Sequence, residues 1–111
     1  MADHPPVALI TGGGKGIGKA IAAALAKNGV FVYINYLADR DSAAQTLEQI
    51  KETGNGELLP FDVTSPASSA EAVSRILDTM NRIDILVNNA GIKDDRLLAM
   101  MKESSWQTVM D

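Results

Sequence analysis

The 111-residue sequence has no cysteine, only one histidine and no cluster of basic residues. Without cysteine, neither a disulfide nor a thiolate metal site can form, which is compatible with a reducing cytoplasm. The single histidine, His4, lies in the polar start of the chain, so we expect neither a metal ligand nor a general base there, and we assign no metal site. A formal net charge of -4 without grouped Lys and Arg argues against nucleic-acid binding.

Long hydrophobic runs are also missing. The start, "MADHPP", has neither the basic nor the apolar region of a signal peptide, and the longest apolar runs, such as "AIAAALA", are too short to cross a bilayer. We therefore expect a cytoplasmic protein without a membrane segment. A hydrophobic content of 46% suits one folded unit, and no repeat or linker divides it, so we treat residues 1–111 together.

The apolar pattern predicts alternating strands and helices. Short, continuously apolar runs predict strands at residues 7–11, 30–36, 57–63 and, with its turn, 83–91. The apolar faces of the helices between them are expected at Ile17, Ile21, Ala24 and Leu25, at Ala43, Leu47 and Ile50, and at Val73, Ile76, Leu77 and Met80. Asn28-Gly29 predicts the end of the first helix, and Ser65-Pro66 the start of the third.

This alternation predicts the α/β fold class. Strand, helix and strand repeated in this way specify a parallel sheet with right-handed crossovers, and a glycine-rich first turn favours the doubly wound, Rossmann-type arrangement. We expect the strand order 3-2-1-4. The first two helices should cover one face of the sheet and the third helix the other.

Glycines crowd the turn after the first strand, in "TGGGKGIG" at residues 11–18. The dinucleotide fingerprint G-x-G-x-x-G cannot be placed, because Ile17 or Lys19 stands where its last glycine is needed. The P-loop pattern G-x-x-x-x-G-K fits residues 13–19, but Ala20 follows and has no hydroxyl for magnesium.

A third spacing does fit, with Gly12, Gly16 and Gly18 directly after the strand. Gly12 would permit a tight turn, Gly16 would let the backbone approach a pyrophosphate, and Gly18 would let the helix pack closely on the strand. The helix N-terminus would then face the anion. The alternative interpretation is a plain glycine-rich turn between a strand and a helix.

Three motifs in order, "TGGGKGIG", "FDVT" and "NNAG", resemble the short-chain dehydrogenase/reductase family. The later part, "NNAGIKDDRLLAMMKESSWQTVMD", looks like the 3-oxoacyl-acyl-carrier-protein reductase branch of that family. The resemblance covers the whole chain and implies a nicotinamide cofactor. It implies that the diphosphate side of the cofactor contacts Gly12, Lys15, Gly16, Ile17 and Gly18, the adenine Asp62 and Val63, and the ribose and nicotinamide side Asn88, Ala90 and Gly91. Thr11 and Asn89 are expected to brace the turns.

The choice of cofactor depends on the end of the second strand. An NAD enzyme places a carboxylate there for the ribose 2'-hydroxyl, whereas a 2'-phosphate needs positive charge. The strand ends in the neutral pair Asn35-Tyr36, and the first acid, Asp39, lies beyond it beside Arg40. We therefore predict NADP (NADPH) as cofactor, with Tyr36 in the site and with Lys15 and Arg40 as phosphate partners. The alternative for Arg40 is an ordinary solvated charge.

The catalytic residues that the resemblance implies cannot be assigned. The family transfers a hydride to a carbonyl, with a Tyr that donates the proton, a Lys that lowers the pKa of that Tyr, a Ser that holds the carbonyl and an Asn that supports a proton relay. Tyr36 has Arg40 in place of Lys four residues on, and we expect it at the wrong end of the sheet for that proton donor. Residues 1–111 are thus interpreted as the N-terminal dinucleotide-binding part of a Rossmann domain, without the catalytic and substrate-binding part.

The resemblance leaves two functions open. In the first, the parent protein is an NADPH-dependent reductase that acts on an acyl-carrier-protein-linked or small carbonyl substrate, and this chain alone is inactive. In the second, the chain is a non-catalytic nucleotide-binding or interaction module. A P-loop NTPase is a distant third.

The apolar residues near the end of the sequence indicate that copies of the chain associate with one another. "SS" at residues 104–105 predicts a fourth helix, and no fifth strand is expected. The fourth strand would then be an exposed sheet edge, and the apolar side chains between Leu97 and Met110 would have little to cover them. We therefore expect a homo-oligomer, joined through the fourth strand or through the segment from Leu97 to Met110.

Overall fold

The computed structural model of the chain describes residues 5–12, 14, 16–89 and 107–110. In chain order, the elements are β1 (Val7–Thr11), α1 (Gly16–Lys27), β2 (Phe31–Tyr36), α2 (Arg40–Lys51), β3 (Asn55–Pro60), α3 (Pro66–Met80), β4 (Ile85–Asn88) and β5 (Gln107–Met110). The strands form one parallel sheet in the order β3-β2-β1-β4-β5. The predicted fold class and the predicted order 3-2-1-4 are confirmed.

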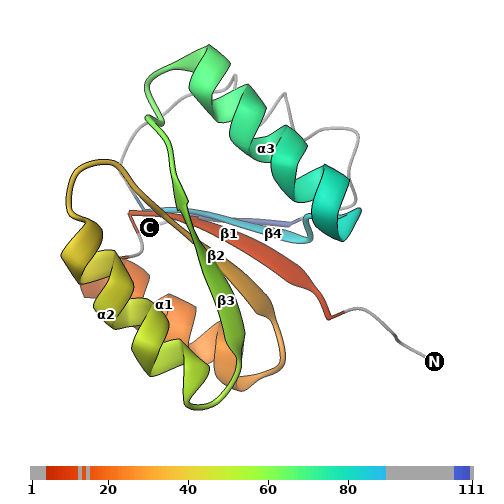
Figure 1. Cartoon of the computed structure of the whole chain (residues 1–111). Helices are drawn as coiled ribbons and strands as arrows, with labels where there is room; N and C mark the ends of the chain where they lie inside the picture. Colours follow the sequence, from red (N-terminus) through yellow and green to blue (C-terminus); the bar gives the residue numbers. More distant parts are fainter. Residues whose placement is uncertain (1–4, 13, 15, 90–106, 111) are drawn as a thin grey trace.

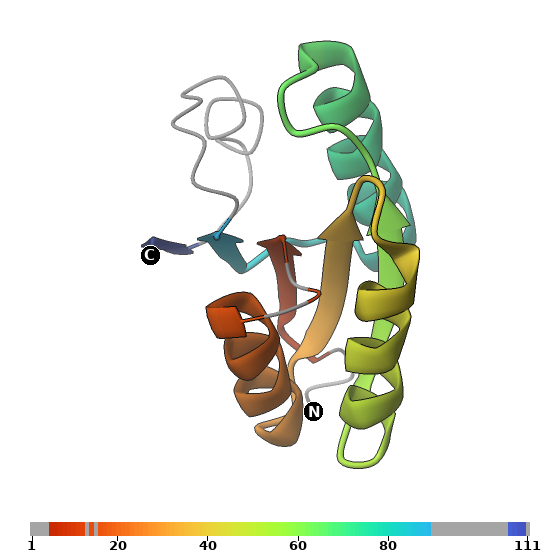
Figure 2. The ribbon, with the colours of Figure 1, turned by 90° about the vertical axis from the view of Figure 1, so that its left-hand side faces the viewer.

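The helices cover both faces of the sheet, as predicted. Figure 1 shows α1 and α2 on one face and α3 on the other, and Figure 2 shows the same layers after a quarter turn. This division follows from right-handed crossovers, since the chain passes from β1 to β2 and β3 in one direction and then returns past β1 to β4. All parallel strands therefore end at the same edge of the sheet, where the loops that follow them meet.

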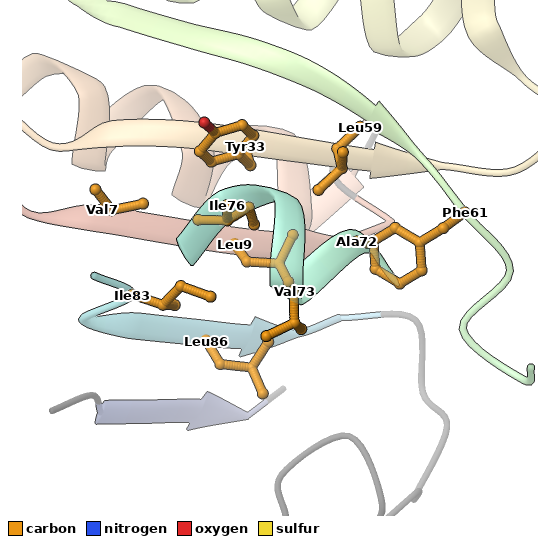
Figure 3. Packing of buried hydrophobic residues seen from close by; sticks show 10 residues of the cluster. All are labelled: Val7, Leu9, Tyr33, Leu59, Phe61, Ala72, Val73, Ile76, Ile83 and Leu86. Carbon is orange, nitrogen blue, oxygen red and sulfur yellow. The ribbon is translucent and has the colours of Figure 1, made fainter. Parts of the chain in front are cut away.

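The strand β1 is buried on both faces, so its side chains enter two cores in alternation. Ala8 and Ile10 face α1 and α2, whereas Val7 and Leu9 face α3. Figure 3 shows the core beneath α3, which consists of Val7, Leu9, Tyr33, Leu59, Phe61, Ala72, Val73, Ile76, Ile83 and Leu86. A strand buried in this way needs the continuous apolar run that predicted it.

The helix α1 turns a different face to the sheet from the one predicted. Its buried residues are Gly18, Ala22 and Ala26, spaced four apart, while Ile17 is 61% exposed. The predicted face is therefore wrong for Ile17 and Ala24, which are exposed, and confirmed for Ile21 and Leu25, which pack against the core. Small residues on the inner face let the helix axis approach the sheet closely, and Ile21 and Leu25 fill the flanks of the contact, where they are half-buried.

The start of α3 follows the prediction, but the end of β3 does not. Ser65 caps α3, since its side chain accepts a hydrogen bond from the backbone N–H of Ser68, and Pro66 is the first helical residue. The third strand runs from Asn55 to Pro60 in place of residues 57–63. It ends early because the carboxylate of Asp62 accepts the Thr64 N–H at 2.9 Å, which folds the chain into a turn.

The segment at residues 107–110 is a strand, which corrects the expected fourth helix. This strand, β5, pairs in parallel with β4, with Ile85 opposite Gln107 and Asn88 opposite Met110. The pairing occupies the outer edge of β4, so the predicted exposed edge at the fourth strand is wrong. The β-branched pair Thr108-Val109 suits a strand. Its pairing with β4 also satisfies the backbone groups at the outer edge of β4, which a helix at residues 107–110 would leave unpaired. The rest of the segment, residues 97–106, lies outside the described residues.

Among residues 5–12, 14, 16–89 and 107–110, no helix has both the length and the apolar content that a membrane crossing needs.

Asp84, just before β4, is hydrogen-bonded to the first residue of β1 and forms an ion pair with Arg82. The carboxylate of Asp84 accepts the Val7 N–H at 2.8 Å and two hydrogen bonds from the guanidinium of Arg82, each 2.7 Å long. Burial alone would raise the pKa of Asp84, but the hydrogen bonds from Arg82 and Val7 and the guanidinium charge outweigh it and lower the pKa.

We expect Asp84→Asn to reduce the free energy of unfolding by about 1–2 kcal/mol at pH 7, because a charge-assisted pair is lost at a partly exposed site. Since the folded-state pKa is lowered, this contribution is complete above the unfolded-state pKa of about 4 and is lost as the pH falls through the folded-state value. Urea unfolding at a series of pH values should therefore show the two proteins converging in acid. A difference that stays constant from pH 7 to pH 2 would contradict the charge as its source.

Candidate functional site

The turn between β1 and α1 has the backbone shape that its glycines predict. Gly12 follows β1 directly, and Gly16 is the first residue of α1. Both have φ of 63°, in the left-handed region that favours glycine. A Cβ placed on Gly16 would meet no atom within 4 Å, so the space beside it is open. The turn thus leads directly into the amino end of α1, whose first N–H groups have no partner within the helix.

Gly18 has no room for a side chain. A Cβ there would lie 2.6 Å from the carbonyl oxygen of Gly12 and would also overlap the side-chain amide of Asn89. That amide is held in place, since its Nδ2 donates to the Gly12 carbonyl at 2.9 Å. The close packing of α1 on β1 that the spacing predicts is therefore present, and Asn89 braces the turn as expected.

The ends of β1 and β4 are joined by Thr11 and Asn88. The hydroxyl of Thr11 lies 3.3 Å from Oδ1 of Asn88 and 3.4 Å from the carbonyl oxygen of Val87, and it donates between them. Thr11 is fully buried and Asn88 nearly so. Thr11 thus joins the ends of β1 and β4, where the two turns predicted to need it begin. Of the residues expected on the nicotinamide side, Asn88 stands at the end of β4, while Ala90 and Gly91 lie outside the described residues.

The buried side-chain amide of Asn35 connects the ends of three strands at this edge. From the sequence alone, Asn35 is only an uncharged residue at the end of the second strand. Asn35, 4% exposed, accepts the Gly12 N–H at Oδ1 over 3.3 Å. Its Nδ2 donates to the carbonyl oxygens of Phe61 at 2.9 Å and Leu59 at 3.3 Å. One side chain of β2 therefore holds the glycine-rich turn and the end of β3. The sequence does carry a signal for it, because an Asn inside an apolar strand run needs buried partners.

Asp62 and Val63 follow β3 at the same edge of the sheet. The carboxylate of Asp62 accepts both the N–H and the hydroxyl of Thr64, at 2.9 and 2.6 Å, and these hydrogen bonds lower its pKa. Its backbone N–H donates to the hydroxyl of Ser68 at 3.1 Å. Val63 packs against the core beneath α3. The loop is thereby tied to α3 and has a fixed shape beside the sheet edge.

A pocket of about 210 Å³ lies between the glycine-rich turn, the end of β2 and the start of α2. It is lined by Gly12, Gly14, Asn35, Tyr36, Leu37, Ala38, Asp39 and Ser42. Tyr36 lines it at the end of β2, at the same edge of the sheet as the turn. A larger cavity of about 320 Å³ lies at the opposite edge, around Ala26 and Gly54, and contains none of the predicted site residues.

Of the two neighbouring charged residues at the start of α2, the acidic one lines this pocket and the basic one does not. Asp39 lines the pocket and caps α2, since its carboxylate accepts the N–H of Ser42 at 3.1 Å and the Ser42 hydroxyl at 2.8 Å. Arg40, the first residue of α2, is exposed and is not among the lining residues. Lys15 lies outside the described residues. Within the described part of the chain, no three His, Cys, Asp or Glu side chains gather to hold a metal ion.

The turn, the buried amide and the pocket together occur where doubly wound proteins bind nucleotides, at the carboxyl edge beside the strand-order reversal. Residues 6–111 match the family model described as "short chain dehydrogenase". The chain belongs to the short-chain dehydrogenase family. Its curated relatives include 3-oxoacyl-acyl-carrier-protein reductases from two bacteria. That of Staphylococcus epidermidis is 38% identical over 94% of this chain, and that of Vibrio cholerae 43% identical over 95%.

The chain spans less than half the length of these relatives, 43% and 42% respectively. Solved structures give the same picture. A metagenomic short-chain oxidoreductase in complex with NADP matches 80% of this chain and 40% of its own, with a TM-score of 0.75 and 31% identity. The Pseudomonas aeruginosa RhlG/NADP active-site complex matches 83% of this chain and 36% of its own, with a TM-score of 0.70 and 34% identity.

The chain has two tyrosines, and both have positions in the described part. Tyr33 is buried in the core beneath α3, where burial raises its pKa. Tyr36 lines the pocket at the end of β2. Since Tyr33 belongs to a core and Tyr36 to the pocket beside the first turn, neither is assigned as a proton donor.

Proposed function

We propose that the chain supplies the cofactor-binding part of an NADPH-dependent oxidoreductase similar to 3-oxoacyl-acyl-carrier-protein reductase, which reduces a ketone to a hydroxyl. The observation that carries the proposal is the glycine-rich turn, with positive φ at Gly12 and Gly16, open space beside Gly16 and no room at Gly18. Such a cradle fits a diphosphate next to a helix amino end. When bound, the nicotinamide group supplies the hydride for the reduction.

Each part of the dinucleotide has proposed contacts on this chain. Gly12, Lys15, Gly16, Ile17 and Gly18 are proposed for the diphosphate, which the backbone N–H groups at the start of α1 would bind, and the pocket lined by Tyr36 would hold the adenosine ribose. Asp62 and Val63 are proposed for the adenine, in the loop that Ser68 and Thr64 hold in shape. The ribose and nicotinamide side is assigned to Asn88, Ala90 and Gly91.

The preference for NADP is part of the proposal and rests on charge. The carboxylate of Asp39 caps α2 through Ser42, so it is already engaged by donors of its own helix. Lys15 in the turn and Arg40 at the start of α2 are the cations proposed for a 2'-phosphate. Two of the similar solved structures are NADP complexes, which supports the same choice.

Lys15→Ala should weaken NADP binding by about 1–3 kcal/mol and leave NAD binding almost unchanged, because only NADP carries the 2'-phosphate. Isothermal calorimetry of the chain with each dinucleotide measures both affinities. Lys27→Ala is the matched control, since it removes the same charge at the far end of α1 and should change neither affinity. Binding of NAD as tight as that of NADP by the unmodified chain would contradict the proposed specificity.

The substrate is proposed to be a carbonyl compound, either linked to acyl carrier protein or small. The names of the relatives support this class. Assembly with further copies of the protein and a cytoplasmic location belong to the same proposal. The segment from Leu97 to Met110, apolar in sequence, is the proposed contact, since β5 already covers the edge of β4.

A further inference from the structure

Thr46 of α2 reaches across to the glycine-rich turn. Its side chain is fully buried, and its Oγ1 lies 2.9 Å from the carbonyl oxygen of Gly14 and 3.2 Å from that of Ser42. The Ser42 carbonyl lies one turn earlier in the same helix, where the helical ladder already supplies the N–H of Thr46. A hydroxyl has one proton to donate, so the shorter contact, to Gly14, is the one that links two parts of the chain.

Gly14 lies directly on the first turn of α2. A Cβ on Gly14 would be 3.1 Å from the backbone nitrogen of Ala43 and 3.4 Å from its Cα. Backbone therefore meets backbone here with no side chain between them. Because Ala43 and Thr46 are three residues apart, they share the helix face that receives the turn, and both are fully buried.

These contacts fix two walls of the pocket relative to each other. Gly12 and Gly14 form one wall, and the start of α2, with Ser42, forms the other. The amide of Asn35 holds the first wall at Gly12, whereas the hydroxyl of Thr46 holds it at Gly14. Thr46 itself does not line the pocket, so its influence on a ligand acts through the position of Gly14.

We propose that Thr46 is a positioning residue, which holds the glycine-rich turn against α2 and so sets the shape of the pocket for the ribose of an adenine nucleotide. The ligand part of this inference rests on the proposed function. The hydroxyl of Thr46 provides this positioning, because a valine at this position would have nearly the same shape but no proton to donate to the Gly14 carbonyl. A serine would keep the hydroxyl and lose only the methyl group.

Amide hydrogen exchange without any nucleotide tests the positioning role by itself. In Thr46→Val, the amides of residues 11–18 should exchange about three- to tenfold faster, while those of α3, on the far face of the sheet, keep their rates. Thr46→Ser should restore slow exchange in the turn. Unchanged rates at residues 11–18 in Thr46→Val, or rates raised equally throughout the chain, would overturn the proposal.

Nucleotide titration tests the consequence for the ligand. Adenosine 2',5'-bisphosphate and adenosine 5'-monophosphate are the probes, and Thr46→Val should weaken both about three- to tenfold, with Thr46→Ser within about twofold of the unmodified chain. Thr53→Val is the control, because Thr53 lines the cavity at the opposite edge. Unchanged affinities in Thr46→Val would overturn the ligand part. If the unmodified chain binds neither probe, the proposed function and the ligand part both fail, while the exchange result still decides the positioning role.

Discussion

Gly18→Ala should lower the affinity for NADP at least tenfold and destabilise the chain by up to about 2 kcal/mol. A Cβ at Gly18 would overlap the Gly12 carbonyl and the Asn89 amide, so the turn or the helix must move. Overpacking of this kind costs about 1–3 kcal/mol, whereas alanine in place of glycine inside a helix returns about 1 kcal/mol. The clash outweighs the gain, since one of its partners is backbone. Calorimetry with NADP and urea unfolding measure the two effects.

Gly29→Ala is the control for this variant. Gly29 has φ of 87° and no atom within 4 Å of a placed Cβ, so alanine brings backbone strain of about 1 kcal/mol without a clash. It lies at the opposite edge of the sheet, beside the larger cavity. A similar loss of stability with unchanged affinity would show that destabilisation alone does not remove binding. A Gly18→Ala chain that is more stable than the unmodified one would contradict the close packing.

Asn35→Leu should reduce the free energy of unfolding by about 2–4 kcal/mol. The variant removes the partner of the Gly12 N–H and of the carbonyl oxygens of Phe61 and Leu59, and each buried group left unpaired costs about 1–3 kcal/mol. Part of this cost is offset because leucine is apolar and of similar size. Urea unfolding at neutral pH gives the difference.

Two further variants make this test specific. Asn28→Leu removes an exposed amide, whose Nδ2 donates to the Ala24 carbonyl at 2.8 Å, and should change stability by less than about 0.5 kcal/mol. Asn35→Asp keeps an acceptor for the Gly12 N–H but points a charged oxygen at carbonyl oxygens, so its cost should be smaller in acid, where the carboxyl can donate. Equal effects of Asn28→Leu and Asn35→Leu would contradict the role of Asn35 in joining the strands.

The sheet could be predicted from the sequence because few alternatives satisfy its pattern. The apolar run from Val7 to Thr11 requires burial on both faces, and the structure places β1 at these residues, in the middle of the sheet. The residues on the inner face of α1 could not all be predicted in this way. Ile17 was expected on that face because it is large and apolar, but it is exposed. Gly18 lies there instead, in contact with the Gly12 carbonyl and the Asn89 amide, and only the fold brings Asn89 to it.

The glycine-rich turn could be predicted because its backbone conformation requires glycine, whereas the buried hydrogen bonds of Asn35 and Thr46 could not. Positive φ at Gly12 and Gly16 follows from the motif. The carbonyl groups that Asn35 and Thr46 meet belong to other elements, and only the fold brings them together. The strand at residues 107–110 is a similar case, because its pairing with β4 outweighs the local signal for a helix.

The bonds that close β1 against β4 have a consequence for the order of events during synthesis. Val7 with Asp84, Thr11 with Asn88 and Gly12 with Asn89 are each separated by 77 residues. A nascent chain that has not yet exposed Asn89 lacks the amide that packs on Gly18, although β1, β2 and β3 can already pair. The anion cradle therefore matures after β1, β2 and β3 have paired, and a ribosome-bound intermediate should acquire nucleotide affinity only after β4 has left the exit tunnel.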